Sequence, residues 1–352
     1  MTQDNKENPY LPLIDKAARL SAKSTTPSTV AVLGAGTMGL GIASVLASRC
    51  GMDVNLYDID IGQLKAAEEI AGINTTTKLS EAVEGVDLVI EAVPEILSLK
   101  KEIIDKCSDV DPFDDMFIAT NTSTFKVKDI SDKSNFAGMH FFNPVHKMPL
   151  VEVVAGEFTS EETIGVLCKT VIAMGKIPLV CNDCSGFVVN RMLMPYLIEF
   201  DKLVSEGHDY SHIDSIMKNH GWPMGPAELC DLVGLDVVYH GSQSIAKEYD
   251  HITVSDNSVC HRLYKNQDFG RKSYRGFYSY DPSSGKKVGR FFTPGETRES
   301  SSVITDRLIS PMLNEAKMLL DENIVDSVEE IDAALALGAG LPPFITTVAD
   351  IT

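Results

Sequence analysis

The first half of the chain alternates between short apolar runs of strand character and longer amphipathic stretches of helical character. The strand-like runs cover residues 29–33, 54–57, 87–93, 116–120, 136–142, 150–154 and 177–180. Helix-like stretches lie between several of them, at 38–48, 61–71, 97–108 and 160–174. Such alternation predicts a mostly parallel β-sheet that helices cover on both faces.

The pattern changes after residue 184, where strand signals disappear and helical periodicity dominates. This helical part repeats itself, because residues 190–199 align with 306–315 and later matches keep an offset of 116 to 118. We therefore predict five parts. They are a leader and linker at 1–28 with one helical stretch, an α/β domain at 29–184, a first helical unit at 185–280, a linker at 281–302 and a second, degenerate helical unit at 303–352.

Composition narrows the class of protein. A chain of 352 residues is long enough for two or three domains, and its net charge of −19 argues against a nucleic-acid partner. The sequence has no apolar run of the roughly 18 residues that span a bilayer, and its first residues lack an apolar signal core. Seven scattered cysteines indicate reduced thiols in the cytoplasm, and the pair Cys181 and Cys184 lacks the second pair that a zinc site needs, so we expect no metal.

A glycine-rich loop follows the first strand-like run. Residues 29–39 read TVAVLGAGTMG, so a strand leads through Gly34 and Gly36 into a helix that contains Gly39. In a dinucleotide site the first glycine permits a tight turn, the second lets the backbone approach a pyrophosphate, and the third lets the helix pack on the strand. Free N–H groups at the helix start receive the negative charge. The alternative is a purely structural glycine turn.

Asp58 ends the second strand-like run, nineteen residues after Gly39. A carboxylate at this spacing accepts hydrogen bonds from both ribose hydroxyls of a bound dinucleotide. It also repels a 2′-phosphate, so it favours NAD over NADP. The loop and the acid together predict NAD as the cofactor.

His140 and Glu152 are the residues most suited to proton transfer. His140 lies near the end of one strand-like run, and Glu152 is the lone acid within another. A histidine at a strand end can take a proton at neutral pH, and a carboxylate partner would fix its tautomer. A buried glutamate should also be paired, because burying a lone charge is costly. Two interpretations stay open at this point: a catalytic pair, or a half-buried histidine and an unrelated glutamate.

Two other polar residues have a functional and a structural interpretation. Ser123 follows the strand-like run 116–120 and could bind a substrate oxygen, or it could belong to an ordinary turn. Asn190 lies near the start of the first helix of the helical part. It could reach toward the first domain, or it could be a surface residue.

Taken together, these segments resemble the L-3-hydroxyacyl-CoA dehydrogenase family, above all the dehydrogenase portion of multifunctional fatty-acid oxidation α-subunits. The resemblance implies a Rossmann-type doubly wound sheet followed by an all-α domain built from two repeated helical units. It also implies that the two units pack together within one chain, so we expect a monomer with this internal pair or a homodimer. The matching stretches are 30–39, 87–95, 121–124, 136–152, 182–195, 221–236 and 270–278.

The resemblance implies a role for each matching residue. His140 would be the general base that removes the 3-hydroxyl proton, and Glu152 would orient it. Ser123 and Asn190 would bind the substrate oxygen, and Asn143 would help to hold the nicotinamide. Hydride would pass from C3 of a small-molecule 3-hydroxyacyl thioester to NAD and leave a 3-ketoacyl product. The other cofactor-binding residues would be Gly34, Gly36, Met38, Gly39, Asp58, Glu95 and Lys100.

The chain departs from the family in three places. Only 28 residues separate Asp58 from Asp87, where family members carry a longer helical hairpin that grips CoA. Tyr274 stands where a glycine is usual, and Asp306 replaces the active-site asparagine in the second helical copy. That copy is therefore expected to be structural.

Three hypotheses follow from the sequence. The leading one is an NAD-dependent 3-hydroxyacyl-CoA dehydrogenase of fatty-acid β-oxidation. The missing hairpin keeps open a dehydrogenase for a free 3-hydroxy acid or for a carrier-protein-bound 3-hydroxyacyl group. The third is a nucleotide-binding regulatory protein without turnover, which the retention of every proposed catalytic side chain disfavours.

Overall fold

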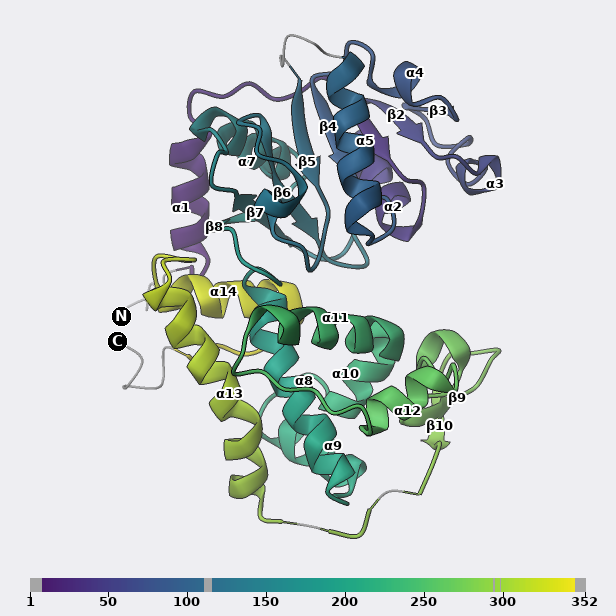
Figure 1. Cartoon of the computed structure of the whole chain (residues 1–352), viewed down its shortest axis with the longest axis vertical. Helices are drawn as coiled ribbons and strands as arrows, with labels where there is room; N and C mark the ends of the chain where they lie inside the picture. The colour runs from purple at the N-terminus through teal and green to yellow at the C-terminus, as the bar shows by residue number, and fades with distance from the viewer. Residues whose placement is uncertain (1–7, 111–115, 294, 298, 346–352) are drawn as a thin grey trace, which may run out of the picture. The chain divides into compact units, whose positions relative to one another are not determined.

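A computed structural model describes residues 8–110, 116–293, 295–297 and 299–345 of the chain. The chain forms two compact units (Figure 1). Among the described residues, the first runs to Val188 and includes Asn323–Ala339, and the second comprises Val189–Glu322 and residues 340–345. The predicted fold class is confirmed, because a mostly parallel sheet with helices is followed by a helical domain.

The first unit is built on an eight-stranded sheet with the order β3-β2-β1-β4-β5-β6-β7-β8. All neighbouring strands are parallel except β6 and β7, which are antiparallel. The strands are β1 Thr29–Leu33, β2 Asp53–Tyr57, β3 Ile73–Thr76, β4 Leu88–Glu91, β5 Phe117–Thr120, β6 Phe136–Phe141, β7 Leu150–Ala155 and β8 Ile177–Asn182.

Helices cover both faces of the central strands. Every residue of β4 and of β6 is buried, including neighbours that point to opposite faces of the sheet. The predicted helix at 61–71 is shorter than expected, because regular helix ends at Leu64. The helices of this unit before residue 188 are α1 Leu11–Leu20, α2 Thr37–Val45, α3 Ile61–Leu64, α4 Leu79–Val83, α5 Leu97–Val110, α6 Val127–Ile130 and α7 Glu161–Ala173.

Two segments outside the predicted α/β domain join this first unit. Helix α1, in the predicted leader, buries Leu13 and Ala17 and packs beside α7 and β8 (Figure 1). Helix α14 (Val328–Ala339), in the predicted second helical unit, packs against α1 and β7. The Lys16 ammonium of α1 lies 3.1 Å from the Glu330 carboxylate of α14. The compact first unit thus includes segments from both sides of the predicted domain 29–184.

The second unit is mainly helical. It also contains a short antiparallel hairpin of β9 (Tyr278–Tyr280) and β10 (Lys287–Arg290). The prediction that strands end before the helical part is therefore wrong at this hairpin, and β10 lies inside the predicted linker. The helices of this unit are α8 Val189–Ser205, α9 Tyr210–Asn219, α10 Pro226–Val233, α11 Leu235–Glu248, α12 Val259–Lys265 and α13 Ser301–Asp321.

Helices α8 and α13 come from the two predicted copies and lie side by side (Figure 1). Arg191 of α8 lies 2.9 Å from Glu315 and 2.6 Å from Glu322. Arg307 of α13 makes the equivalent pairs, each at 2.6 Å, with Glu199 and Glu206. Each of these residues recurs at an offset of 116. Such reciprocal contacts are typical of an isologous interface between two equivalent subunits.

A buried carboxylate joins α9 to α10 and to the hairpin. One oxygen of Asp214 accepts a hydrogen bond of 2.8 Å from the Ala227 backbone N–H, and the other accepts one of 2.7 Å from the Tyr278 hydroxyl. The residue is 1% exposed. Burial raises the pKa of the Asp214 carboxyl to about 7, although both hydrogen bonds act to lower it. The carboxyl therefore holds a proton in the folded protein at pH values where the unfolded chain has lost it.

We expect Asp214→Asn to stabilise the helical unit at pH 8 by roughly 2 kcal/mol and to give little gain near pH 4. The pKa of about 7 in the folded protein lies above the ordinary value of 3.8. The Asp214 carboxyl therefore contributes its full stabilisation when the pH is below 3.8, and this stabilisation is lost as the pH rises to 7. An amide does not ionise, and its oxygen can still accept from Ala227. Urea unfolding followed by fluorescence of Trp222, the single tryptophan, measures this difference. A difference that stays constant with pH would contradict it.

Across the part of the chain that the structure describes, none of the helices combines the length and the apolarity needed to cross a bilayer.

Candidate active site

The glycine loop joins β1 to α2 as predicted. Gly34 has a φ of +103°, and a Cβ there would lie 2.6 Å from the Ala92 carbonyl oxygen. A Cβ on Gly39 would lie 1.8 Å from the Gly34 carbonyl oxygen. The fold itself thus requires glycine at both positions. A Cβ on Gly36 would meet no protein atom within 4 Å.

Gly36 is therefore left open at the start of α2, where it serves as the N-cap without a side-chain capping bond. Exposed backbone N–H groups at a helix start suit a phosphate group. Met38, in the first turn of this helix, is half-buried. The loop fits the pyrophosphate of a dinucleotide, because Gly36, the glycine predicted to let the ligand approach, is the one beside which the protein leaves space.

Asp58 lies directly after β2 and is tied to the same loop. Its Oδ2 accepts a hydrogen bond of 2.8 Å from the Ala35 N–H, and its Oδ1 accepts one of 2.9 Å from the Asp60 N–H. The side chain is half-buried. These bonds hold an acid beside the glycine loop, which is the arrangement that the ribose of NAD requires.

His140 and Glu152 lie opposite each other on the antiparallel strands β6 and β7. The His140 Nδ1 is 2.6 Å from the Glu152 Oε2, and the two residues are 4% and 0% exposed. The other glutamate oxygen accepts a hydrogen bond of 3.0 Å from the Val188 N–H. With Nδ1–H donating to the carboxylate, Nε2 is left as the nitrogen that can accept a proton.

Two aromatic rings enclose the His140 imidazole. The ring of Phe142 lies 4.7 Å from it, centroid to centroid, in an edge-to-face arrangement, and the ring of Phe187 lies at 5.6 Å. These ring contacts and the hydrogen bond to Glu152 act on the imidazole from different residues. The histidine is thus held in one orientation by packing as well as by its hydrogen bond.

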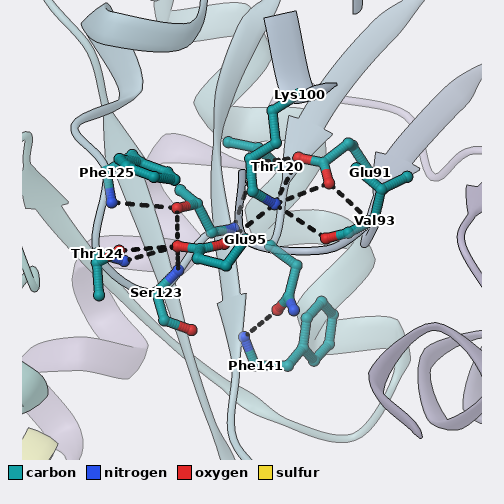
Figure 2. A network of polar contacts seen from close by, with 11 residues as sticks. Glu91, Val93, Glu95, Lys100, Thr120, Ser123, Thr124, Phe125 and Phe141 are labelled. Atoms are coloured by element: carbon teal, nitrogen blue, oxygen red, sulfur yellow. Dashed lines mark hydrogen bonds and ion pairs between the residues drawn. The ribbon is translucent and has the colours of Figure 1, made fainter. Parts of the chain in front are cut away.

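Ser123 lies in a turn that one carboxylate organises. Glu95 Oε1 accepts hydrogen bonds from the Ser123 N–H at 3.0 Å, the Thr124 N–H at 3.1 Å and the Thr122 hydroxyl at 2.6 Å. Figure 2 shows these bonds converging on the Glu95 side chain. Glu95, predicted from the resemblance to bind the cofactor, therefore also fixes the backbone of the turn that carries Ser123.

The Ser123 turn follows β5, and His140 lies near the end of the neighbouring parallel strand β6. Thr120 of β5 pairs with Gly138 of β6, and the Asn121 Oδ1 accepts a hydrogen bond of 2.9 Å from the Phe141 N–H. The turn and the histidine thus lie at the same, carboxyl edge of the sheet, where open α/β sheets bind ligands. Asn121 was not predicted, because an asparagine followed by threonine and serine is typical of an ordinary turn.

Two of the predicted site residues, Asn143 and Asn190, lie on segments other than those that carry Ser123, His140 and Glu152. Asn143 is exposed on the segment after β6. Asn190 is the second residue of α8 and belongs to the second unit, whereas Ser123, His140 and Glu152 belong to the first. Their roles stay predictions.

Lys100 and Glu91 form a buried ion pair beside the Ser123 turn. Lys100, predicted to contact the cofactor, is only 1% exposed and lies 2.9 Å from Glu91 and 3.2 Å from Glu95. Glu91 was not predicted. A signal for it exists, because it follows the wholly apolar run 88–90, and a charge that ends a buried strand must find a partner.

Two family models match the chain. The model described as "3-hydroxyacyl-CoA dehydrogenase, NAD binding domain" matches residues 29–71 and 61–184. The model described as "3-hydroxyacyl-CoA dehydrogenase, C-terminal domain" matches residues 186–280 and again 303–352. The two segments matched by the first model overlap at residues 61–71, within the short stretch between Asp58 and Asp87.

Individual relatives agree with these matches. The fatty acid oxidation complex subunit alpha of Acinetobacter baumannii strain SDF is 38% identical over 374 aligned residues, covering 94% of this chain and 52% of the relative. The chain thus spans about half the length of that relative. The structure of 3-hydroxybutyryl-CoA dehydrogenase from Escherichia coli K12 is 25% identical, with a TM-score of 0.73 and coverage of 89% of each chain. The (S)-3-hydroxybutyryl-CoA dehydrogenase from Ralstonia eutropha is 30% identical, with a TM-score of 0.63 and coverage of 73% of this chain and 100% of that one.

Proposed function

Because this chain belongs to the 3-hydroxyacyl-CoA dehydrogenase family of NAD-dependent oxidoreductases, we propose that it oxidises an (S)-3-hydroxyacyl thioester to the 3-ketoacyl thioester. The observation that supports this most is the His140–Glu152 pair, which lies at the same sheet edge as the Ser123 turn. The residues of the glycine loop and Asp58 suit NAD, which supplies the hydride acceptor when bound.

The proposed reaction breaks one C–H bond and one O–H bond of the substrate. His140 Nε2 removes the proton of the 3-hydroxyl group, while the hydrogen on C3 leaves with its electron pair as hydride, and a C=O bond forms. Glu152 stabilises the imidazolium that results, because its carboxylate is already hydrogen-bonded to Nδ1. Ser123 and Asn190 bind the oxygen of the substrate, and Asn143 holds the nicotinamide side. We assign Gly34, Gly36, Met38, Gly39, Asp58, Glu95 and Lys100 to the cofactor-binding region.

The thioester carrier is proposed to be CoA, held more weakly than in relatives. Between β2 and β4 the chain contains only α3, β3 and α4, where the resemblance implies a longer CoA-gripping hairpin. The nucleotide end of CoA then has fewer protein contacts. The second candidate, a dehydrogenase for a free 3-hydroxy acid or a carrier-protein-bound group, rests on this same observation alone, and the relatives named above do not favour it.

A substrate panel read by NADH absorbance tests both candidates. We expect turnover of (S)-3-hydroxybutyryl-CoA, and kcat/KM for the matching pantetheine ester within about tenfold, since tenfold corresponds to roughly 1.4 kcal/mol of lost contact. The free acid should be much slower because it lacks the thioester. A free acid oxidised as fast as the CoA ester would favour the second candidate. NADH binding with no oxidation of any member would instead favour a regulatory nucleotide-binding protein.

The internal pair of helices α8 and α13 bears on assembly. We infer that it takes the place of a contact between two chains, because its ion pairs are reciprocal as in a symmetric dimer. The helical unit then needs no second chain to complete this interface.

A further inference from the structure

Glu91, the last residue of β4, is fully buried and uses both of its oxygens. Its Oε1 accepts hydrogen bonds of 2.7 Å from the Val93 N–H and 2.9 Å from the Lys100 ammonium. Its Oε2 accepts a hydrogen bond of 2.6 Å from the Thr120 hydroxyl at the end of β5. Figure 2 shows that these partners come from three segments around one carboxylate.

Lys100 is shared between two carboxylates. Its ammonium lies 2.9 Å from Glu91 and 3.2 Å from Glu95, and it also donates to the Val93 carbonyl at 3.3 Å. A lysine has three donors, and these acceptor groups, of which Glu91 contributes both oxygens, use them within the protein. The positive charge of Lys100 is therefore paired with the two glutamate carboxylates, and its side chain is only 1% exposed.

Glu95 remains ionised because of this lysine. Partial burial acts to raise the pKa of its carboxyl, but the Lys100 charge and the hydrogen bonds from Thr122 and Ser123 hold the pKa below its ordinary value. The side chain keeps 37% of its surface exposed. An ionised carboxylate is the stronger acceptor for the backbone N–H groups of the Ser123 turn.

Two chains of hydrogen bonds thus lead from Glu91 to the Ser123 turn. One runs through Lys100 and Glu95 to the Ser123 and Thr124 N–H groups. The other runs through the Thr120 hydroxyl, whose oxygen also accepts a 3.2 Å hydrogen bond from the Thr122 N–H. Both start at a residue that does not itself lie in the turn.

We propose that Glu91 is a positioning residue of the dehydrogenase, which fixes the turn that presents the Ser123 hydroxyl to the substrate oxygen. This inference rests on the proposed function. Glu91 contacts neither substrate nor cofactor in this scheme and acts through Lys100, Glu95 and Thr120. A small displacement of a substrate-positioning group is enough to lower the rate of a reaction strongly.

The test is a double-mutant cycle between Glu91→Gln and Ser123→Ala, read as kcat for the CoA ester. We expect Glu91→Gln to lower kcat by about 10- to 100-fold, as loss of residues that orient catalytic groups commonly does. The double variant should be no slower than Ser123→Ala alone, because the two changes remove the same interaction. A purely structural role would make the two losses multiply, and that result would overturn the proposal. Activity is to be normalised to the NAD-binding fraction of each preparation.

Glu330→Gln is the matched control. It also removes one charge from a largely buried lysine–glutamate pair of the first unit, but Glu330 pairs with Lys16 and accepts a hydrogen bond from the Asp326 N–H, whereas the Ser123 N–H bonds to Glu95. We expect its kcat to stay within about twofold of the unmodified protein. Should Glu91→Gln fail to fold, Thr120→Val cuts the second chain of hydrogen bonds and must show the same lack of additivity with Ser123→Ala.

A second readout does not depend on activity. Amide hydrogen exchange in Glu91→Gln should speed up at Ser123 and Thr124, whose N–H groups bond to Glu95, and should stay unchanged at Phe141, whose N–H bonds to Asn121. Unchanged exchange at the turn would overturn the proposal even if no substrate is found. Lack of NADH formation by the unmodified protein, with faster exchange in the variant, would overturn only the proposed function.

Discussion

Replacing His140 by glutamine should lower kcat for 3-hydroxyacyl oxidation by about 10²- to 10⁴-fold, which is the usual contribution of a general base. The His140 Nδ1 is committed to Glu152 at 2.6 Å, so proton removal depends on Nε2. A glutamine amide can still donate to Glu152 and fills a similar volume, but it cannot accept a proton at neutral pH. The change therefore isolates the chemistry of proton transfer from the packing around it.

Stopped-flow or steady-state NADH absorbance measures this loss, and fluorescence titration with NADH should give an unchanged Kd. The matched control is His146→Gln, the same substitution at an exposed histidine a few residues later in the chain. It should retain full kcat. Full activity of His140→Gln would reject the assigned base, whereas equal losses in both variants would point to a general effect on the segment between β6 and β7.

The elements that the sequence predicted best are those buried on both sides. The run 29–33 is apolar from Val30 onward, and the structure places β1 at residues 29–33, between β2 and β4. A strand in this position needs apolar residues on both faces, so its sequence alone identifies it. The same argument applies to β6 and β7, whose predicted bounds differ from the structure by one residue at one end.

The missed strands are short, and two of them, β3 and β10, are partly or fully exposed. Residues 73–76 read INTT and form β3 at the edge of the sheet, where only β2 pairs with them. All four residues of β10 are exposed. Such strands exist because a neighbour supplies hydrogen bonds, and no pattern of apolar residues within the segment records that neighbour. The same limit explains why α1 and α14 were not assigned to the first unit.

In the site, too, contacts that a local sequence pattern indicates could be predicted, whereas contacts that depend on the arrangement of separate segments could not. The His140–Glu152 contact could be predicted because a lone acid in an apolar strand demands a partner and a histidine was at hand. The buried pair of Glu91 and Lys100 follows the same rule, but its partners Thr120 and Glu95 come from other segments. Their convergence depends on the order of strands in the sheet. Likewise, the helical repeat was visible in the sequence, but the reciprocal pairing of its arginines and glutamates was not.

That pairing leads to a second strong expectation: Arg191→Met should destabilise the helical unit by about 3 kcal/mol, whereas Arg307→Met should cost about 1 kcal/mol or less. The two arginines occupy equivalent positions in the two copies. However, the Arg191 side chain is 0% exposed and that of its partner Glu315 is 1% exposed, while the Arg307 side chain is 31% exposed. Removing Arg191 leaves the Glu315 carboxylate buried, with His251 as its remaining side-chain partner among the contacts described.

Urea unfolding monitored by Trp222 fluorescence compares the two variants, since this buried tryptophan lies in the helical unit. Adding Glu315→Gln to Arg191→Met should restore part of the lost stability, because the unpaired charge is then removed as well. The corresponding addition of Glu199→Gln to Arg307→Met should change little. Equal losses of stability for the two arginine variants would show that burial does not distinguish the copies. A double variant less stable than Arg191→Met alone would show that Arg191 stabilises α8 and α13 through packing rather than by pairing with the charge of Glu315. The Arg191 guanidinium lies 4.4 Å from the centre of the Tyr249 ring, which would allow such packing.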